Sequence, residues 1–197
     1  MSDEPDNDPV IISVAAYSAD PVAYEEKYAT HLLDRPARFA SLISPRSKVL
    51  DVGCGPGRDI RIFAEAGHIP TGIDLNPSFI KMARRHGEVI AGDIREISSL
   101  FSPLTFDGIW AQASLVHLQK SEVEKLLRDL SDLLKPNGLI YACVPATGES
   151  GWLDENDGRR WYTTWPEDSF EKTMASAGFQ IVDVTHGPYV EAWATKT

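Results

Sequence analysis

Cysteine is scarce in this chain, with two residues among 197. Two thiols cannot form the disulfide framework of a small secreted domain, and a cysteine-based metal centre needs more ligands. Cys54 and Cys143 both lie in apolar or glycine-rich segments. We therefore expect reduced, packed cysteines and no bound metal.

Long apolar runs are missing as well. No segment approaches the ~20 consecutive apolar residues that a membrane-spanning helix needs. The N-terminal residues are acidic and lack the apolar core of a secretion signal. These absences lead us to expect a cytoplasmic protein without a membrane partner.

Basic side chains are outnumbered: the chain has 19 Lys and Arg against 29 Asp and Glu, which gives a net charge of −10. Such a charge repels polyanions at long range, so nucleic acid is disfavoured as a partner. The length suits one domain, because a chain of this size can bury a sizeable core.

The most informative positive feature is the run VLDVGCGPGRD at residues 49–59. It predicts a buried strand, a glycine-rich turn and the start of a helix. Gly53, Gly55 and Gly57 remove side chains where the backbone bends and where a ligand can approach it. The unpaired N–H groups at the helix start can face that ligand. A dinucleotide-binding turn would place its third glycine at Arg58, so the spacing disfavours a nicotinamide cofactor.

Strand and helix patterns alternate from Lys48 onward, which predicts a mostly parallel sheet with helices on both faces. The last two strands have no helix between them, so one strand is expected to be antiparallel. The predicted strands are 49–52, 69–73, 88–91, 106–110, 139–144, 179–185 and 189–195.

The segments outside this alternation have their own expected structures. Residues 1–15 are acidic and rich in proline at their start, and we expect a disordered tail there. Residues 16–46 form an N-terminal helical cap on a single domain over 16–197. Residues 146–165 are rich in Gly, Asp and Trp, and they predict a long loop on the substrate side.

Acidic residues follow two of the predicted strands. Ligands of such sheets bind beyond the carboxyl ends of the strands. Asp74 follows the second strand, about 20 residues past the glycine turn, where a carboxylate suits the two hydroxyls of a ribose. Asp93 follows the third strand, and His117 lies beyond the fourth.

The pattern D-x-G-x-G-x-G of the glycine turn resembles the first motif of class I S-adenosylmethionine-dependent methyltransferases. Further segments are similar to that family in the same order, and together they cover roughly residues 17–195. The family turn L-K-P-G-G is matched with Asn137 in place of its first glycine, a mild departure because asparagine tolerates left-handed backbone. These further segments are Asp74, Gly92-Asp93, 106–118, 134–138 and 177–179. The resemblance implies an α/β, Rossmann-like doubly wound sheet of seven strands in the order 3-2-1-4-5-7-6.

The resemblance also implies S-adenosylmethionine as cofactor and S-adenosylhomocysteine as product. Asp51 would hold the ammonium of the cofactor or only order the turn, and Ala111 would offer its backbone carbonyl to that ammonium. Leu75 and Ile94 would pack beside the adenine, and Asp93 would accept from its amino group. The expected cofactor-binding residues are Tyr24, Asp51, Gly53, Cys54, Gly55, Asp59, Asp74, Leu75, Asn76, Asp93, Ile94 and Ala111.

Methyl transfer from a sulfonium needs alignment, exclusion of water and removal of the acceptor's proton. His117 is the candidate catalytic residue, because a neutral imidazole can serve as a base near pH 7, although it can equally only orient its neighbours. Aromatic and basic side chains near the N-terminus and in 146–165 are candidates for acceptor binding. They are Tyr17, Tyr28, Trp152, Arg159 and Tyr162.

We therefore expect methyl transfer to an oxygen or nitrogen atom of a small organic molecule, by a monomer or a homodimer. Two alternatives stay open. One is a protein or tRNA methyltransferase that works with a partner, and the other is a non-catalytic module that binds S-adenosylmethionine.

Overall fold

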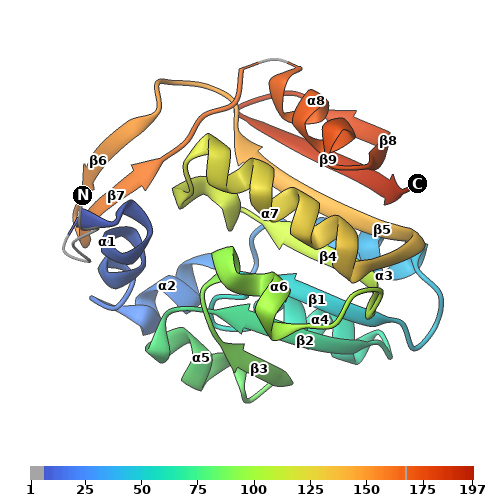
Figure 1. Ribbon diagram of the computed structural model, residues 1–197. Helices are drawn as coiled ribbons and strands as arrows, with labels where there is room; N and C mark the ends of the chain where they lie inside the picture. The colour runs from blue at the N-terminus through green and yellow to red at the C-terminus, as the bar shows by residue number, and fades with distance from the viewer. Residues whose placement is uncertain (1–6, 167) are drawn as a thin grey trace.

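The computed structural model describes residues 7–166 and 168–197. Its centre is a seven-stranded sheet (Figure 1) with the strand order β3-β2-β1-β4-β5-β9-β8. β9 runs antiparallel to both of its neighbours, so the predicted order and the single antiparallel strand are confirmed. The strands are β1 (Lys48–Val52), β2 (Ile69–Asp74), β3 (Glu88–Ala91), β4 (Phe106–Gln112), β5 (Leu134–Pro145), β8 (Phe179–Thr185) and β9 (Tyr189–Lys196).

Helices cover both faces of this sheet, because consecutive strand residues point to opposite sides. Leu50 and Ile109 face a core cluster that includes the apolar side chains of α7 and α8. Val49 and Trp110 face a second cluster, which includes Phe39 of α3 and a phenylalanine of α4. The helices beside the sheet are α3 (Asp34–Leu42), α4 (Arg58–Glu65), α5 (Pro77–Ala83), α6 (Ile97–Leu100), α7 (Lys120–Leu133) and α8 (Ser169–Ser176).

Local sequence signals account for where these helices begin. Asn76 accepts from the N–H groups of the first turn of α5, and proline occupies the first position of that helix. Gln119 and Glu122 form a capping box at the start of α7. At the beginning of β5, Asn137 has φ 62°, the left-handed conformation expected of it.

The expected disorder over 1–15 is wrong for the part that the structure describes. α1 (Pro9–Ala16) is a helix that Asp8 caps by accepting from the N–H of Val10, 2.8 Å away. Val10 and Ser13 are buried, which gives α1 a fixed place on the molecule. Residues 1–6 of the expected tail lie outside the described residues. The N-terminal cap continues with α2 (Pro21–Tyr28), which Asp20 caps by accepting from the N–H of Ala23 at 2.9 Å.

The expected loop over 146–165 is a β-hairpin instead. Its strands are β6 (Gly151–Glu155) and β7 (Gly158–Tyr162), and they form a separate two-stranded sheet. Figure 1 shows this hairpin beside α1, away from the central sheet, and β7 packs against that helix. The hairpin and α1 therefore build one wall together, although about 140 residues separate them in the chain.

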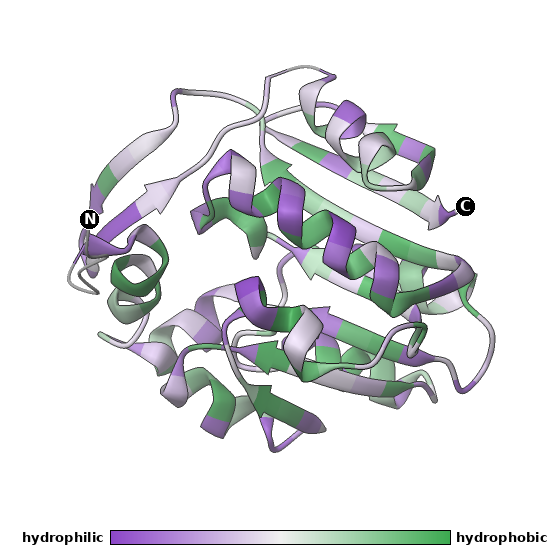
Figure 2. Cartoon of the chain, in the orientation of Figure 1, coloured by the Kyte–Doolittle hydropathy of each residue, from purple (hydrophilic) through white to green (hydrophobic). Residues whose placement is uncertain are grey.

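Apolar residues concentrate along the central strands, and the outward side of α7 is hydrophilic (Figure 2). α1 is also largely apolar, which matches its packing against the rest of the molecule. Among the described residues, every helix is too short or too polar to pass through a bilayer.

Candidate active site

Three glycines shape the turn that follows β1. Gly53, Gly55 and Gly57 have φ of 68°, 54° and 94°, in the left-handed region that side chains disfavour. A Cβ on Gly53 would lie 2.5 Å from the Cβ of Ser114, and one on Gly57 would lie 2.7 Å from the Cα of Ala83. A Cβ on Gly55 would meet nothing within 4 Å. Two of the glycines therefore allow close packing, and Gly55 faces open space.

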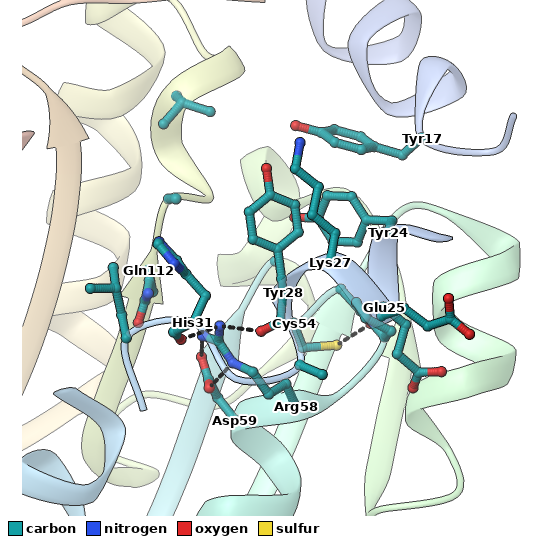
Figure 3. Close-up of a pocket in the computed structure, with 18 of the residues that line it drawn as sticks. Tyr17, Tyr24, Glu25, Lys27, Tyr28, His31, Cys54, Arg58, Asp59 and Gln112 are labelled. Carbon is teal, nitrogen blue, oxygen red and sulfur yellow. Dashed lines mark hydrogen bonds and ion pairs between the residues drawn. The ribbon is translucent and has the colours of Figure 1, made fainter. Parts of the chain in front are cut away.

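The turn opens into a cavity of about 870 Å³ at the carboxyl ends of the strands. Figure 3 shows the side chains of α2 and of the glycine turn around it. A smaller pocket of about 100 Å³ adjoins the cavity. Both spaces are lined by Tyr17, Tyr24, Gly53, Gly55 and Ala113. The larger volume lies within the range of roughly 300–1,000 Å³ that is typical of small-molecule sites.

Asp74 ends β2 and lines the smaller pocket. Its carboxylate accepts hydrogen bonds from the backbone N–H groups of Gly55 and Asn76, each at 2.8 Å. Burial raises the pKa of the Asp74 carboxyl, and these backbone donors oppose that rise. A carboxylate can accept more than two hydrogen bonds, so Asp74 keeps acceptor capacity for the hydroxyls of a ligand.

Asp51 also lines the larger cavity, and its side chain is buried. Its Oδ2 has no hydrogen-bond partner among the described residues. Burial raises the pKa of the Asp51 carboxyl well above its usual value, and the nearby Asp59 adds to that rise. Asp59 itself already accepts three hydrogen bonds, from Arg58 at 2.7 and 2.9 Å and from the indole N–H of Trp110 at 2.8 Å.

Asp93 follows β3 and lines the smaller pocket. Its carboxylate accepts from the backbone N–H of Arg95 at 2.9 Å and pairs with the guanidinium of the same residue at 2.6 Å. Arg95 also pairs with Asp8 at 2.8 Å and with Glu122 at 3.1 Å. The end of β3 is thereby tied to the start of α1 and of α7.

His117 ends a short 3₁₀ helix, η3 (Leu115–His117), beyond β4. Its Nδ1 lies 2.6 Å from the backbone oxygen of Trp161, which can only accept, so Nδ1 carries the proton. Its Nε2 accepts from the hydroxyl of Tyr17 at 2.9 Å. Burial lowers the pKa of His117 to about 4. The ring is therefore neutral at pH 7, with both nitrogens bonded.

Three tyrosines of the N-terminal cap pack against one another along the cavity, edge to face or tilted. The ring centroids of Tyr17 and Tyr24 lie 5.2 Å apart, and those of Tyr24 and Tyr28 lie 4.7 Å apart. All three line the cavity, together with Tyr162 from β7. Burial raises the pKa of Tyr17 and of Tyr24 above the usual value, so both phenols keep their protons at neutral pH.

The structure gathers most of the predicted site residues around these two spaces, with three exceptions. Ala111 is fully buried and does not line either space, whereas the next residue, Gln112, does. Trp152 and Arg159 also lie outside the lining. The Arg159 guanidinium stacks on the Trp152 ring at 4.5 Å, on the hairpin. Adjacent strand residues face opposite sides, and here the cavity side belongs to Arg160.

Arg160 also lines the larger cavity, although it is not among the predicted site residues. Its side chain is 2% exposed, it pairs with Glu155 and, at 2.6 Å, with Asp157, and it lies 4.1 Å over the ring of Tyr17. A usable signal was present, because Asp157-Gly158 is a hairpin turn sequence, and the strand after it would alternate its two arginines between faces.

Comparisons with known proteins agree with this geometry. A family model described as a methyltransferase domain matches residues 24–184. Curated relatives include ubiquinone biosynthesis O-methyltransferases. The protein of Xanthomonas campestris pv. campestris (strain B100) is 32% identical over 108 residues, 52% of this chain and 44% of the relative. The protein of Xylella fastidiosa is 37% identical over 101 residues, 48% of this chain and 40% of the relative. The chain thus spans less than half the length of these two relatives.

A solved structure shares the fold over the whole chain. It is the 1,6-didemethyltoxoflavin-N1-methyltransferase of Burkholderia thailandensis, with 1,6-didemethyltoxoflavin and S-adenosylhomocysteine bound. Its TM-score is 0.75 at 23% identity, and the match covers 100% of this chain and 92% of that chain. The family model runs from α2 into β8 and so takes in the glycine turn and the carboxyl ends of β1, β2, β3 and β4. The chain belongs to the methyltransferase-domain family, and the class I S-adenosylmethionine-dependent type that its motifs predict is confirmed.

Proposed function

We propose that the protein binds S-adenosylmethionine across the larger cavity and the adjoining smaller pocket. It then transfers the methyl group of this cofactor to an oxygen or nitrogen atom of a small organic molecule. The observation that carries this proposal is the buried carboxylate of Asp51, which lines the same cavity as the open Gly55. Leaving a buried carboxylate oxygen without a partner is unfavourable. The ammonium of the cofactor's methionine moiety would supply that partner.

The smaller pocket fits the other end of the cofactor. Asp74 has free acceptor capacity for the ribose hydroxyls, and Asp93 stands one strand further for the amino group of the adenine. Leu75 and Ile94 give this pocket an apolar part that can pack on the ring. The remaining proposed cofactor contacts are Tyr24, Gly53, Cys54, Gly55, Asp59 and Asn76, all of which line one of the two spaces.

When bound, S-adenosylmethionine supplies an activated methyl group. The residues of the chain then have to align the acceptor, exclude water and accept a proton. Both ring nitrogens of His117 are bonded, one of them to Tyr17, so the geometry favours an orienting role over that of a base. We infer that His117 is a positioning residue, which fixes the Tyr17 hydroxyl at the border of the two spaces.

The acceptor side of the cavity supports a small, ring-bearing acceptor. Tyr28, Tyr162 and Tyr189 line it, and aromatic walls favour planar groups. The names of the curated relatives and of the structural neighbour refer to ubiquinone biosynthesis and to 1,6-didemethyltoxoflavin. We extend this small-molecule class to the present chain, together with a cytoplasmic location and a monomeric or homodimeric state.

Calorimetry followed by a transfer assay tests this function. S-adenosylhomocysteine is expected to bind, and NAD is not. Mass spectrometry would then follow a deuterated methyl group from S-adenosylmethionine to small phenols and N-heterocycles. Arg159→Gln serves as the control, because Arg159 does not line either space. The affinity of this variant for S-adenosylhomocysteine is expected to match that of the wild type.

The alternatives give different results in the same two assays. Binding of NAD alone would contradict the cofactor assignment. Binding of S-adenosylhomocysteine without transfer to any small molecule would instead favour the non-catalytic module or a macromolecular acceptor.

A further inference from the structure

Arg58 occupies the junction between the glycine turn and the N-terminal cap. It is the first residue of α4, directly after the left-handed Gly57. Figure 3 shows its guanidinium between Asp59 and the end of α2. One edge donates to both carboxylate oxygens of Asp59, and Nη1 donates to the backbone oxygens of Tyr28 at 3.2 Å and His31 at 2.8 Å.

Apart from Arg58, α2 is held mainly by aromatic contacts, because Tyr24 packs against Tyr17 and Phe79 with ring centroids 5.2 and 5.0 Å apart. None of the residues of α2 is buried, yet this helix carries Tyr24 and Tyr28 over the cavity. The last carbonyls of a helix lack partners within the helix, and a cation beside them is favourable. Arg58 supplies that cation with its side chain 17% exposed. A second tie to α2, the ion pair of Arg85 with Glu25 at 2.6 Å, is solvent-exposed and therefore weak.

The other side of the guanidinium is anchored in the core. Asp59 accepts from the indole N–H of Trp110 on β4 at 2.8 Å. Trp110 is fully buried and stacks on Tyr141 of β5, with centroids 4.2 Å apart. A continuous chain of contacts thus runs from the sheet through Asp59 and Arg58 to the end of α2.

We propose that Arg58 is a positioning residue that braces α2 against the glycine turn, so that Tyr24 and Tyr28 form a fixed wall over the cofactor. Asp59, which is also a proposed cofactor contact, orients Arg58 in this arrangement. Arginine is required because its planar fork can bind a carboxylate and two carbonyls at once, which the single ammonium of lysine cannot do. The part of the proposal that concerns the cofactor rests on the proposed function.

Hydrogen exchange measured by mass spectrometry on the ligand-free, full-length protein tests whether Arg58 holds α2 in place. In Arg58→Gln, amides of residues 20–33 are expected to exchange about tenfold faster or more, since a hydrogen bond from a charged donor is lost. Peptides from β1 and β4 serve as internal references and are expected to stay unchanged. In Arg58→Lys, the exchange rate of these amides is expected to lie between the rates of wild type and of Arg58→Gln. In Arg85→Gln, the rate is expected to remain within about twofold of wild type, because the ion pair of Arg85 is exposed.

Calorimetry with S-adenosylhomocysteine on the same variants tests the consequence for the site. Arg58→Gln is expected to bind about tenfold more weakly. Unchanged exchange over residues 20–33 in both Arg58 variants would overturn the brace, and so would faster exchange spread equally over β1 and β4. If the wild type fails to bind S-adenosylhomocysteine, the proposed function fails, whereas the exchange data still decide whether Arg58 holds α2.

Discussion

Replacing Asp51 with asparagine is expected to weaken cofactor binding and, at the same time, to stabilise the empty protein. The substitution keeps the shape of the side chain and removes its charge. The carboxyl group of Asp51 is buried, and its Oδ2 has no partner in the described part of the chain. Stability and binding therefore respond in opposite directions.

The stability effect follows from the raised pKa of Asp51, whose cause is chiefly burial. A group with a raised pKa in the folded state gives stability below its unfolded pKa and loses it as the pH rises through the folded pKa. Asparagine does not ionise, so Asp51→Asn does not lose this stability as the pH rises. Above the folded-state pKa of Asp51, the variant is therefore expected to be more stable than wild type. The gain is about 1–3 kcal/mol, the cost of one unsatisfied buried group. For a chain of this size it would raise Tm by roughly 2–12 °C.

The same substitution, Asp51→Asn, is expected to weaken the binding of S-adenosylhomocysteine. Losing a hydrogen bond between charged groups costs about 1.5–3 kcal/mol, which is about 10- to 100-fold in the affinity for S-adenosylhomocysteine. The ligand's ammonium also lowers the pKa of Asp51, so wild-type affinity is expected to rise with pH up to the free pKa and then level off. Calorimetry in two buffers of different ionisation enthalpy measures the released proton. A variant that is less stable than wild type but binds S-adenosylhomocysteine equally well would show that Asp51 only supports the turn.

Two further predictions concern stability alone. Gly57→Ala is expected to destabilise the protein by about 2–4 kcal/mol, because it combines a left-handed φ with a contact of 2.7 Å to the Cα of Ala83. Gly67→Ala, with φ 84° and nothing within 4 Å, is the control and should lose only about 1–2 kcal/mol in urea unfolding. His117, with its pKa lowered to about 4, stabilises the fold above pH 6.5 and loses about 3 kcal/mol of that stability as the pH falls to 4. Urea unfolding from pH 7 to 4 is therefore expected to show a steeper loss for wild type than for His117→Gln, and equal slopes would contradict the assigned environment of the ring.

The central sheet could be predicted from the sequence because its strands are short apolar runs or, for β8 and β9, alternate apolar and polar residues, with a turn or helix signal beside each. Asp74 and Asp93 followed from the same reasoning, since residues just past parallel strands meet at one edge of a sheet. The cap of α1 was equally visible, because Asp8-Pro9 places an N-cap residue directly before a proline, as Asp20-Pro21 does at the start of α2.

Other parts of the site depend on tertiary contacts that no local pattern encodes. The tautomer of His117 is set by a carbonyl on β7, 44 positions away in the chain. Arg160 is buried because the hairpin packs against the N-terminal cap, where its guanidinium lies over the ring of Tyr17. Whether Ala111 or Gln112 lines the cavity depends on where β4 ends. The residue types alone could suggest these segments, but they could not decide which of two neighbouring residues faces the cavity.

The contact between α1 and β7 has a consequence for the order in which the molecule assembles. The N–H of Trp161 donates to the hydroxyl of Ser13 at 2.8 Å, across 148 positions of the chain, and the hydroxyl of Tyr17 reaches His117 across 100. Closing such long loops costs entropy, which contacts between sequence neighbours avoid. The glycine turn and the acid after β2 arise from one local strand–helix–strand unit, so the cofactor half can form early. The wall that α1 and β7 build together is completed only when these two distant segments meet.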